Sequence, residues 1–419
     1  MIPKRNPRFL PTRSIPALLA FLVLAGCDLN DTSCDAPLTP AQGLIRWVYF
    51  GVDAPASAPV EVNKYHFEFP FLGDPTHGGL WDPVTDSPVI PPGVITPQDQ
   101  TTLNPARTGS VNSNAIRAAA TTTNSTVVYI LDKFGTLVQF DPASVTFSAK
   151  LDFSQQVTQG IAQRFAVTPD RRFAFITVNS AQTAMSTGNV LVADLNSFSI
   201  VSTIALPAGT VAGGIAITPD GRLAYVVTKP YSGSGPSVVF VIDVATRTIS
   251  TTIPVTGYSS LGQIAITPDG TEAYLLNGIE ADGFSFPVLD LQSNTVQPPV
   301  SILFGSGKNL ITSYTQSYMA LHPDGTRLYL VPVSGGPVLI VSTITKTVSN
   351  VIPLAAGAGP VFGAQPTFTP DGIHLSFMSG MNLVVFINTL TDTEESSITL
   401  PPPPFEPIRN FSSFFVPKP

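Results

Sequence analysis

A turn motif built on Pro-Asp-Gly recurs along this chain at nearly constant intervals. The sequence Ile-Ala-Ile-Thr-Pro-Asp-Gly occurs twice, and related versions place the proline five times, with spacings of 50, 49, 55 and 47 residues. One apolar run precedes each motif and a second follows it. A third run then ends in Asp, Asn or Ser, and a short turn leads to a fourth. The prolines are Pro169, Pro219, Pro268, Pro323 and Pro370. The chain therefore repeats a unit of four short strands.

Four strands in every 47 to 55 residues predict the blades of a β-propeller. Thr123 lies 46 residues before the first of these prolines and Pro417 lies 47 residues after the last, so both fall where a further repeat would place its turn. The C-terminal strand then lacks partners, and the N-terminal region supplies them. We expect the second strand in "GLIRWVYFG", and the third-strand end at Asp82, the turn and the fourth strand in "GLWDPVTDSPVIP". We expect an all-β chain folded as a seven-bladed β-propeller of four-stranded antiparallel blades. Its last blade is closed by N- and C-terminal strands, which removes the free edge of an open ring.

The repeat resembles a known family. "TPDG…AYVV…VFVIDVATRTISTTIPV" is similar to the YVTN-type β-propeller repeat of bacterial surface proteins and lactonase-like propellers, and the resemblance covers about residues 43 to 419. Ser342 and Asn388 depart from it, because the repeat usually has Asp there. The resemblance implies the fold and leaves the activity open, since one propeller fold hosts many functions.

The N-terminus has the pattern of a targeting segment. A basic stretch precedes the apolar run Ile15–Gly26, which ends in Leu-Ala-Gly-Cys and resembles a bacterial lipobox. The resemblance implies a lipoprotein signal peptide over 1–26, lipidation of Cys27, a lipidated tether over 27–42 and a propeller over 43–419. An ordinary signal peptide with a cysteine near its end is the alternative. The basic residues are Lys4, Arg5, Arg8 and Arg13.

Charge narrows the class of partner. Loss of the four basic residues of the signal peptide would change the net charge from −7 to −11, which disfavours a nucleic-acid partner. Only Cys34 would then remain beside Cys27, so the globular part has no internal disulfide, and the role of Cys34 stays open. We expect a monomer at the bacterial cell envelope, periplasmic or surface-facing, in contact with the membrane only through its lipid anchor.

The repeated carboxylates have a structural and a chemical interpretation. Two rings of Asp could suggest metal binding or acid–base chemistry, but Pro-Asp-Gly is turn chemistry and Asp-x-x-Thr/Ser caps local N–H groups. Ser and Asn can replace Asp in a cap and not in a ligand set, so we assign both rings to structure. The first ring is Asp170, Asp220, Asp269, Asp324 and Asp371, and the second is Asp141, Asp194, Asp243 and Asp290.

Variation concentrates in the loops on the opposite face, between strands 2 and 3 and between blades, where binding sites of rigid scaffolds lie. Five residues before each proline, a polar ring is expected at the mouth of a central channel. It could receive an anionic or carbonyl-rich ligand, or it could be a solvated rim. The candidate ligand-binding residues are Arg117, Arg164, Gln263, Tyr318, Gln365 and Arg409.

Catalytic motifs are missing from the sequence. It contains no Gly-x-Ser-x-Gly, His-Glu-x-x-His, Cys-x-x-Cys-His or phosphate loop, so we expect no catalytic residue, no metal and no cofactor. The alternative is a metal site formed by His66, Glu68, Asp74 and His77.

The sequence therefore predicts a lipid-anchored, non-catalytic scaffold that binds a protein or glycan partner through its variable loop face. A lactonase-like hydrolase at the channel mouth is the alternative, although no general base is visible there. A propeller that holds a redox cofactor such as a quinone is a third hypothesis, for which the sequence offers no ligand set.

Overall fold

The computed structural model describes residues 127–399, with gaps, and the backbone of seven strands outside that range. The chain divides into Met1–Leu44, which lies outside the described residues, and a compact unit, Ile45–Pro419. The gaps are 133–134, 142–145, 158–159, 180–187, 234, 278–284, 303–316, 333–335, 355–365, 369–371 and 380–382.

Six sheets of the compact unit have four antiparallel strands that follow chain order. The first sheets are β6 (Ile116–Thr121), β7 (Val128–Asp132), β8 (Thr136–Asp141) and β9 (Thr146–Asp152); β10 (Ile161–Val167), β11 (Phe173–Asn179), β12 (Gly188–Asp194) and β13 (Ser199–Ala205); and β14 (Thr210–Ile217), β15 (Leu223–Pro230), β16 (Ser237–Asp243) and β17 (Thr248–Val255). The others are β18 (Leu261–Ile266), β19 (Glu272–Asn277), β20 (Ser285–Asp290) and β21 (Thr295–Ser301); β22 (Ser317–Leu321), β23 (Arg327–Pro332), β24 (Val338–Ser342) and β25 (Thr347–Ile352); and β26 (Thr367–Phe368), β27 (His374–Ser379), β28 (Leu383–Asn388) and β29 (Thr393–Thr399).

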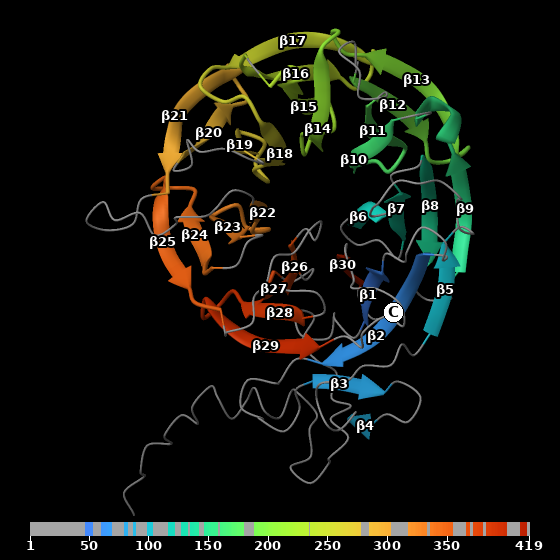
Figure 1. Ribbon diagram of the computed structural model, residues 1–419, viewed down its shortest axis with the longest axis vertical. Coiled ribbons are helices and arrows are strands. Elements are labelled where there is room, and N and C mark those ends of the chain that lie inside the picture. Colours follow the sequence, from blue (N-terminus) through green and yellow to red (C-terminus); the bar gives the residue numbers. More distant parts are fainter. Residues whose placement is uncertain are drawn as a thin grey trace, which may run out of the picture. The chain divides into compact units, whose positions relative to one another are not determined.

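The first strand of each sheet lies innermost and the fourth lies at the periphery (Figure 1). Innermost strands contact one another from β6 through β10, β14 and β18 to β22, and β30 (Phe411–Val416) contacts both β26 and β6. Each sheet is thus a blade that packs face to face on its neighbours, as the repeat predicted.

A further sheet joins strands from both ends of the compact unit. β1 pairs with β30, Trp47 opposite Val416, and also with β2. The expected second strand in "GLIRWVYFG" is therefore present, whereas the expected third strand is not where we placed it. β2 takes that place, β3 lies beyond it, and β5 pairs with β2. No turn motif marks these strands, so the repeat could not reveal them. The strands are β1 (Trp47–Val52), β2 (Val60–Glu68), β3 (Gly79–Asp82), β4 (Ser87–Pro88), β5 (Asp99–Leu103) and β30 (Phe411–Val416).

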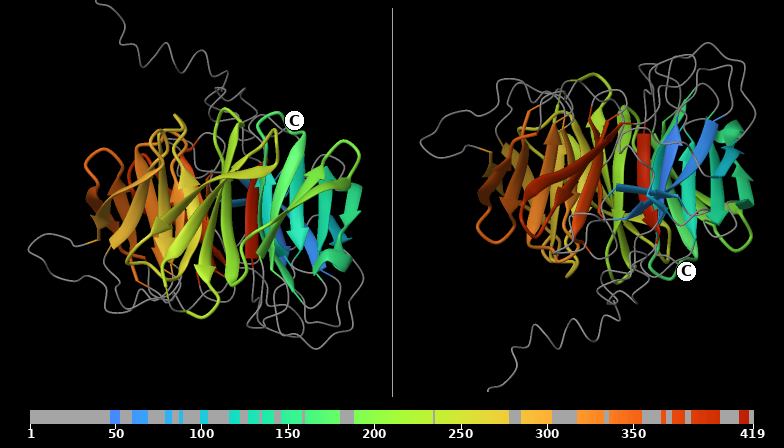
Figure 2. Two further views of the ribbon diagram at one scale, coloured as in Figure 1. Left: turned by 90° about the horizontal axis from the view of Figure 1, so that it is seen from above. Right: turned by 90° about the horizontal axis from the view of Figure 1, so that it is seen from below.

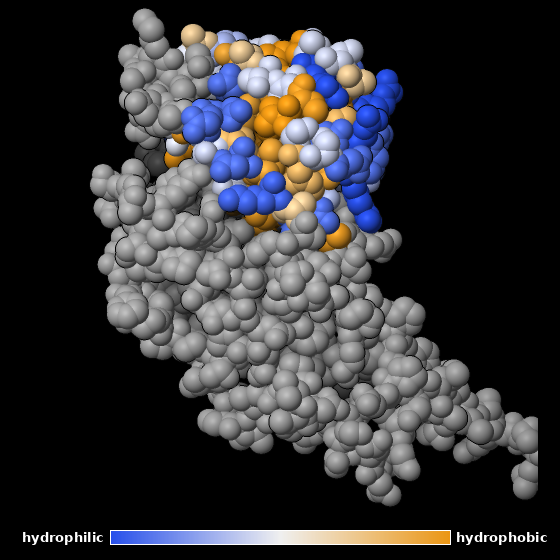
Figure 3. Space-filling view, turned by 90° about the vertical axis from the view of Figure 1, so that its right-hand side faces the viewer, coloured by the Kyte–Doolittle hydropathy of each residue, from blue (hydrophilic) through white to orange (hydrophobic). Residues whose placement is uncertain are grey.

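The core lies between blades. Phe175 of β11 packs in one cluster with Val226 and Phe240 of the next blade, and each is at most 3% exposed. Second and third strands are buried at nearly every position because both of their faces meet a neighbouring sheet, which explains their continuous apolar runs. Fourth strands alternate between exposed and covered residues, and the side with β13 shows hydrophobic surface among hydrophilic residues (Figure 3).

The strands run between two faces of the propeller (Figure 2). Register places Val167 opposite Ala174 and Phe173 opposite Asp194, so the strand 1–2 turn and the strand 3–4 turn of a blade lie on the same side. We call this side the turn face and the opposite side the loop face. Among the described residues the only helix is the four-residue η1 (Ser154–Val157), and none is long and apolar enough to cross a membrane.

Candidate functional site

The Pro-Asp turns at Pro169, Pro219 and Pro268 share one hydrogen-bond pattern. The hydroxyl of Thr168 donates to Asp170 Oδ1 at 2.5 Å, and the same oxygen accepts the amide N–H of Arg172 at 3.0 Å. Asp220 and Asp269 have the same partners, and the threonine hydroxyl is the main cause that lowers the pKa of all three carboxyls. These carboxylates are occupied within their own turns.

The strand 3–4 turns are capped in a similar way. Asp243 Oδ1 accepts the amide N–H of Thr246 at 2.7 Å. Ser342 accepts from Thr345 at 3.2 Å, and Asn388 accepts from Leu390 at 2.9 Å, so Ser and Asn perform the same task. In the part of the chain that the structure describes, no three His, Cys, Asp or Glu residues come together as metal ligands.

His322 replaces the first threonine of this motif in the β22–β25 blade. Its Nδ1 lies 2.7 Å from Asp324 Oδ1, as the threonine hydroxyl does elsewhere, and its Nε2 lies 3.0 Å from the carbonyl oxygen of Gly372 in the next blade. The Asp324 pKa is lowered: burial, the largest influence, opposes hydrogen bonds from Thr326 and His322, which prevail. The imidazole is 11% exposed, and its contact with Gly372 links two blades.

The channel-mouth candidates fall on innermost strands. Arg164 lies on β10, Gln263 on β18 and Tyr318 on β22, and all three are partly buried. Arg164 Nη1 donates to the carbonyl of Gln163 at 2.9 Å, and Gln263 Oε1 accepts the amide N–H of Met319 in the next blade at 3.2 Å. Of the other candidates, Arg117 lies on β6, where the structure describes only the backbone. Gln365, Arg409, Cys27 and Asp371 lie outside the described residues.

A β-bulge interrupts four innermost strands at the level of these candidates. The register shifts lie between 116 and 118, 162 and 164, 212 and 215, and 261 and 263. A Cβ on Gly262 would meet no atom within 4 Å, whereas one on Gly214 would lie 3.0 Å from the Gly262 carbonyl oxygen. Bulges redirect side chains and are frequent beside binding sites. The pairing of the innermost strands is therefore irregular at the level where we expect the channel mouth.

Sequence reasoning missed a contact that repeats between blades. Five residues, each four positions after the end of a third strand, have φ between 47° and 58°, and we call them latch residues. Each latch side chain contacts the second strand of the preceding blade. The pairs are Phe198 with Tyr129, Arg247 with Phe173, Asn294 with Tyr225, Lys346 with Glu272 and Tyr274, and Asp392 with Arg327 and Tyr329.

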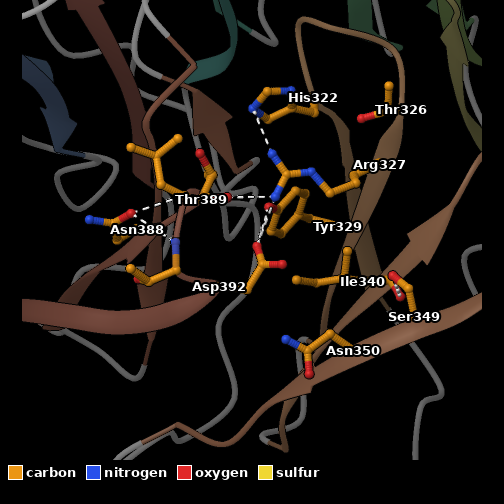
Figure 4. A network of polar contacts seen from close by, with 12 residues as sticks. His322, Thr326, Arg327, Tyr329, Ile340, Ser349, Asn350, Asn388, Thr389 and Asp392 are labelled. Atoms are coloured by element: carbon orange, nitrogen blue, oxygen red, sulfur yellow. Dashed lines mark hydrogen bonds and ion pairs between the residues drawn. The ribbon is translucent and has the colours of Figure 1, made fainter.

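The chemistry differs from one latch to the next. Arg247 lies over the Phe173 ring at 4.8 Å, and Asn294 accepts from the Tyr225 hydroxyl at 2.9 Å. Around Asp392, Oδ1 accepts from the Tyr329 hydroxyl at 2.8 Å and from Arg327 Nη1 at 3.0 Å (Figure 4). Burial is the main cause that raises the pKa of the Tyr329 hydroxyl, so it remains a neutral donor. A left-handed turn residue and a partner 63 to 74 positions away give no local sequence signal.

Comparisons with known proteins identify the fold and no family. No protein-family model matches the chain, and no curated protein does. Among solved structures, a functionally unknown protein from Desulfotomaculum acetoxidans is similar with a TM-score of 0.56 and 18% identity, over 88% of this chain and 98% of that one. Hydrazine synthase of Kuenenia stuttgartiensis gives 0.54 and 16%, over 71% and 90%.

A third similarity bears directly on the fold. The β-propeller domain of Cps50 (Swd1) from Myceliophteria thermophila aligns with a TM-score of 0.50 and 10% identity, over 70% of this chain and 88% of that domain. The chain has a β-propeller fold. At these identities the similarity concerns architecture, and the activities of the three proteins are not transferred.

Proposed function

We propose that this β-propeller is a lipid-anchored, non-catalytic binding scaffold of the bacterial cell envelope, and that its loop face receives a protein or glycan partner. We further propose seven blades, the last one made from both ends of the propeller. The pairing of β1 with β30 supports this closure, because each of the other six sheets has an innermost strand at the place that β30 takes. The lipobox resemblance at Cys27 supports the anchor.

The observation that supports the proposal is that the two faces differ: polar groups are engaged within the turn face, and sequence varies on the loop face. On the turn face the described carboxylates and hydroxyls are engaged in caps and latches. On the loop face the connections vary in length and sequence from blade to blade, and the innermost strands bulge at the same level. A rigid ring with variable loops suits recognition, and the mouth around Arg164 is the place proposed for a ligand group.

The test is a thermal-shift screen of the full chain in detergent against lactones, sugars, divalent metals and peptidoglycan fragments. A ligand at 100 times its dissociation constant stabilises the native state by about 2.7 kcal/mol. A shift that Arg164→Ala abolishes and Lys150→Ala, a change on the outer strand β9, preserves would locate the ligand at the mouth. Hydrolysis of a lactone that requires Arg164 would contradict the scaffold and favour the lactonase-like alternative.

A further inference from the structure

Two aliphatic side chains project from the turn face in neighbouring blades. Ile344 is 79% exposed and Leu390 is 64% exposed, whereas the next most exposed large hydrophobic residue among those described reaches 41%. Both are the second residue after the end of a third strand. The equivalent places in other described blades hold Asn196, Ala245 and Gln292. In the blades whose strand 3–4 turns the structure describes, these two apolar side chains, which we call the tips, are therefore confined to one arc of the turn face.

The charged latch residues beside these tips already have partners. Lys346, two residues after Ile344, contacts Glu272, and Asp392, two residues after Leu390, contacts Arg327 at 3.0 Å. Paired charges cost less to move into a less polar medium than isolated charges do. This arc can therefore leave water more easily than a face of unpaired charges.

Strand pairing indicates the face at which β1 begins. β1 begins at Trp47, which pairs with Val416 at the end of β30. In the other blades the end of the innermost strand and the start of the second strand flank the strand 1–2 turn, as Val167 and Ala174 do. If β30 and β1 are the inner strands of the last blade, the start of β1 lies on the face that carries the two tips.

We propose that the turn face is apposed to the membrane and that Ile344 and Leu390 insert into the interface of the bilayer that holds the anchor. This inference rests on the proposed lipid anchor at Cys27 and on the proposed closure. Lipid chains and inserted apolar side chains add their affinities, so the tips would fix the orientation of a domain that the anchor alone would leave free to tumble. The loop face and its channel mouth would then be directed away from the bilayer toward a partner.

The experiment uses the lipidated full chain with Cys34→Ser, reconstituted in phosphatidylcholine vesicles. Single cysteines for an environment-sensitive fluorophore are introduced as Ile344→Cys and Leu390→Cys. Matched controls are Ser232→Cys, exposed on the loop face between β15 and β16, and Val296→Cys, 40% exposed on the outer strand β21. We expect the emission of labels 344 and 390 to shift to the blue and to be quenched by lipids brominated on their acyl chains, with no change at the controls.

Vesicle flotation and the mass of the Cys27 peptide separate the two proposals. Acylated Cys27 with unquenched labels at 344 and 390 overturns membrane docking and leaves the anchor standing. Quenching at 232 reverses the orientation and also overturns the inference. A chain that carries no acyl group and does not float overturns the anchor and the docking together. Circular dichroism of each labelled variant, matched to the parent, shows that the comparison is made on folded protein.

Discussion

Asp392→Gly isolates the contribution of one latch. Asp392 has φ of 52°, a conformation that glycine adopts without strain, so the change removes the side chain and not the turn. Two hydrogen bonds to Oδ1 are lost, from the Tyr329 hydroxyl at 2.8 Å and from Arg327 Nη1 at 3.0 Å. Tyr329 is 0% exposed, so its hydroxyl is left without this acceptor away from water.

The expected loss of unfolding free energy is about 2–4 kcal/mol. Leaving a buried hydroxyl unpaired costs about 1–3 kcal/mol. The side chains of Arg327 and Asp392 are 24% and 22% exposed, so loss of their ion pair adds about 1 kcal/mol after solvent screening. Urea unfolding followed by circular dichroism measures the change. Leu390→Ala, in the same turn and 64% exposed, is the control and should stay within about 0.5 kcal/mol.

A double-mutant cycle with Tyr329→Phe tests the cause. Removing the hydroxyl along with the carboxylate eliminates the unpaired donor, so the double variant should lose less than the two single variants together, with a coupling of about 1–2 kcal/mol. Strict additivity, or a loss for Asp392→Gly no larger than that of the control, would refute the idea that latch side chains bind one blade to the next.

Two further predictions concern the turns and the innermost strands. The pKa values of Asp170, Asp220 and Asp269 are lowered in the folded state, chiefly by threonine hydroxyls, so their contribution to stability is present above the unfolded pKa of about 4 and is lost as pH falls through the folded value. Thr218→Val should weaken this acid dependence in urea titrations between neutral and acid pH while Thr218→Ser keeps it, and equal profiles for the two would contradict the assignment. Gly214→Ala should lower the melting temperature, with a cost of about 1–3 kcal/mol, because its Cβ would lie 3.0 Å from the Gly262 carbonyl oxygen of the next blade. Gly262→Ala, whose Cβ meets nothing within 4 Å, should be nearly neutral, and similar melting temperatures for both variants would show that the strands can separate without cost.

The candidate site was only partly predictable. Arg164, Gln263 and Tyr318 were correctly placed on innermost strands by counting back from the turn proline, because a fixed offset from a local motif survives folding. Their partners were not predictable. Gln263 contacts the amide of Met319, 56 residues away in the next blade, and only the packing of two sheets brings these groups within 3.2 Å.

The sequence alone determined the blade. Pro-Asp-Gly turns, capping residues at third-strand ends and strands apolar on both faces are local properties, and they require four-stranded sheets that stack on one another. The tertiary structure decided the contacts between blades. Glu272 contacts Lys346, 74 residues away, and Arg327 contacts Asp392, 65 residues away. The acidic residue lies on the second strand in the first pair and is the latch residue in the second pair. The N-terminal strands β2 and β5 likewise find their places only through pairing. Local chemistry specifies turns and strands because neighbouring residues in the chain form them, whereas a contact between sheets exists only once the sheets have packed on one another.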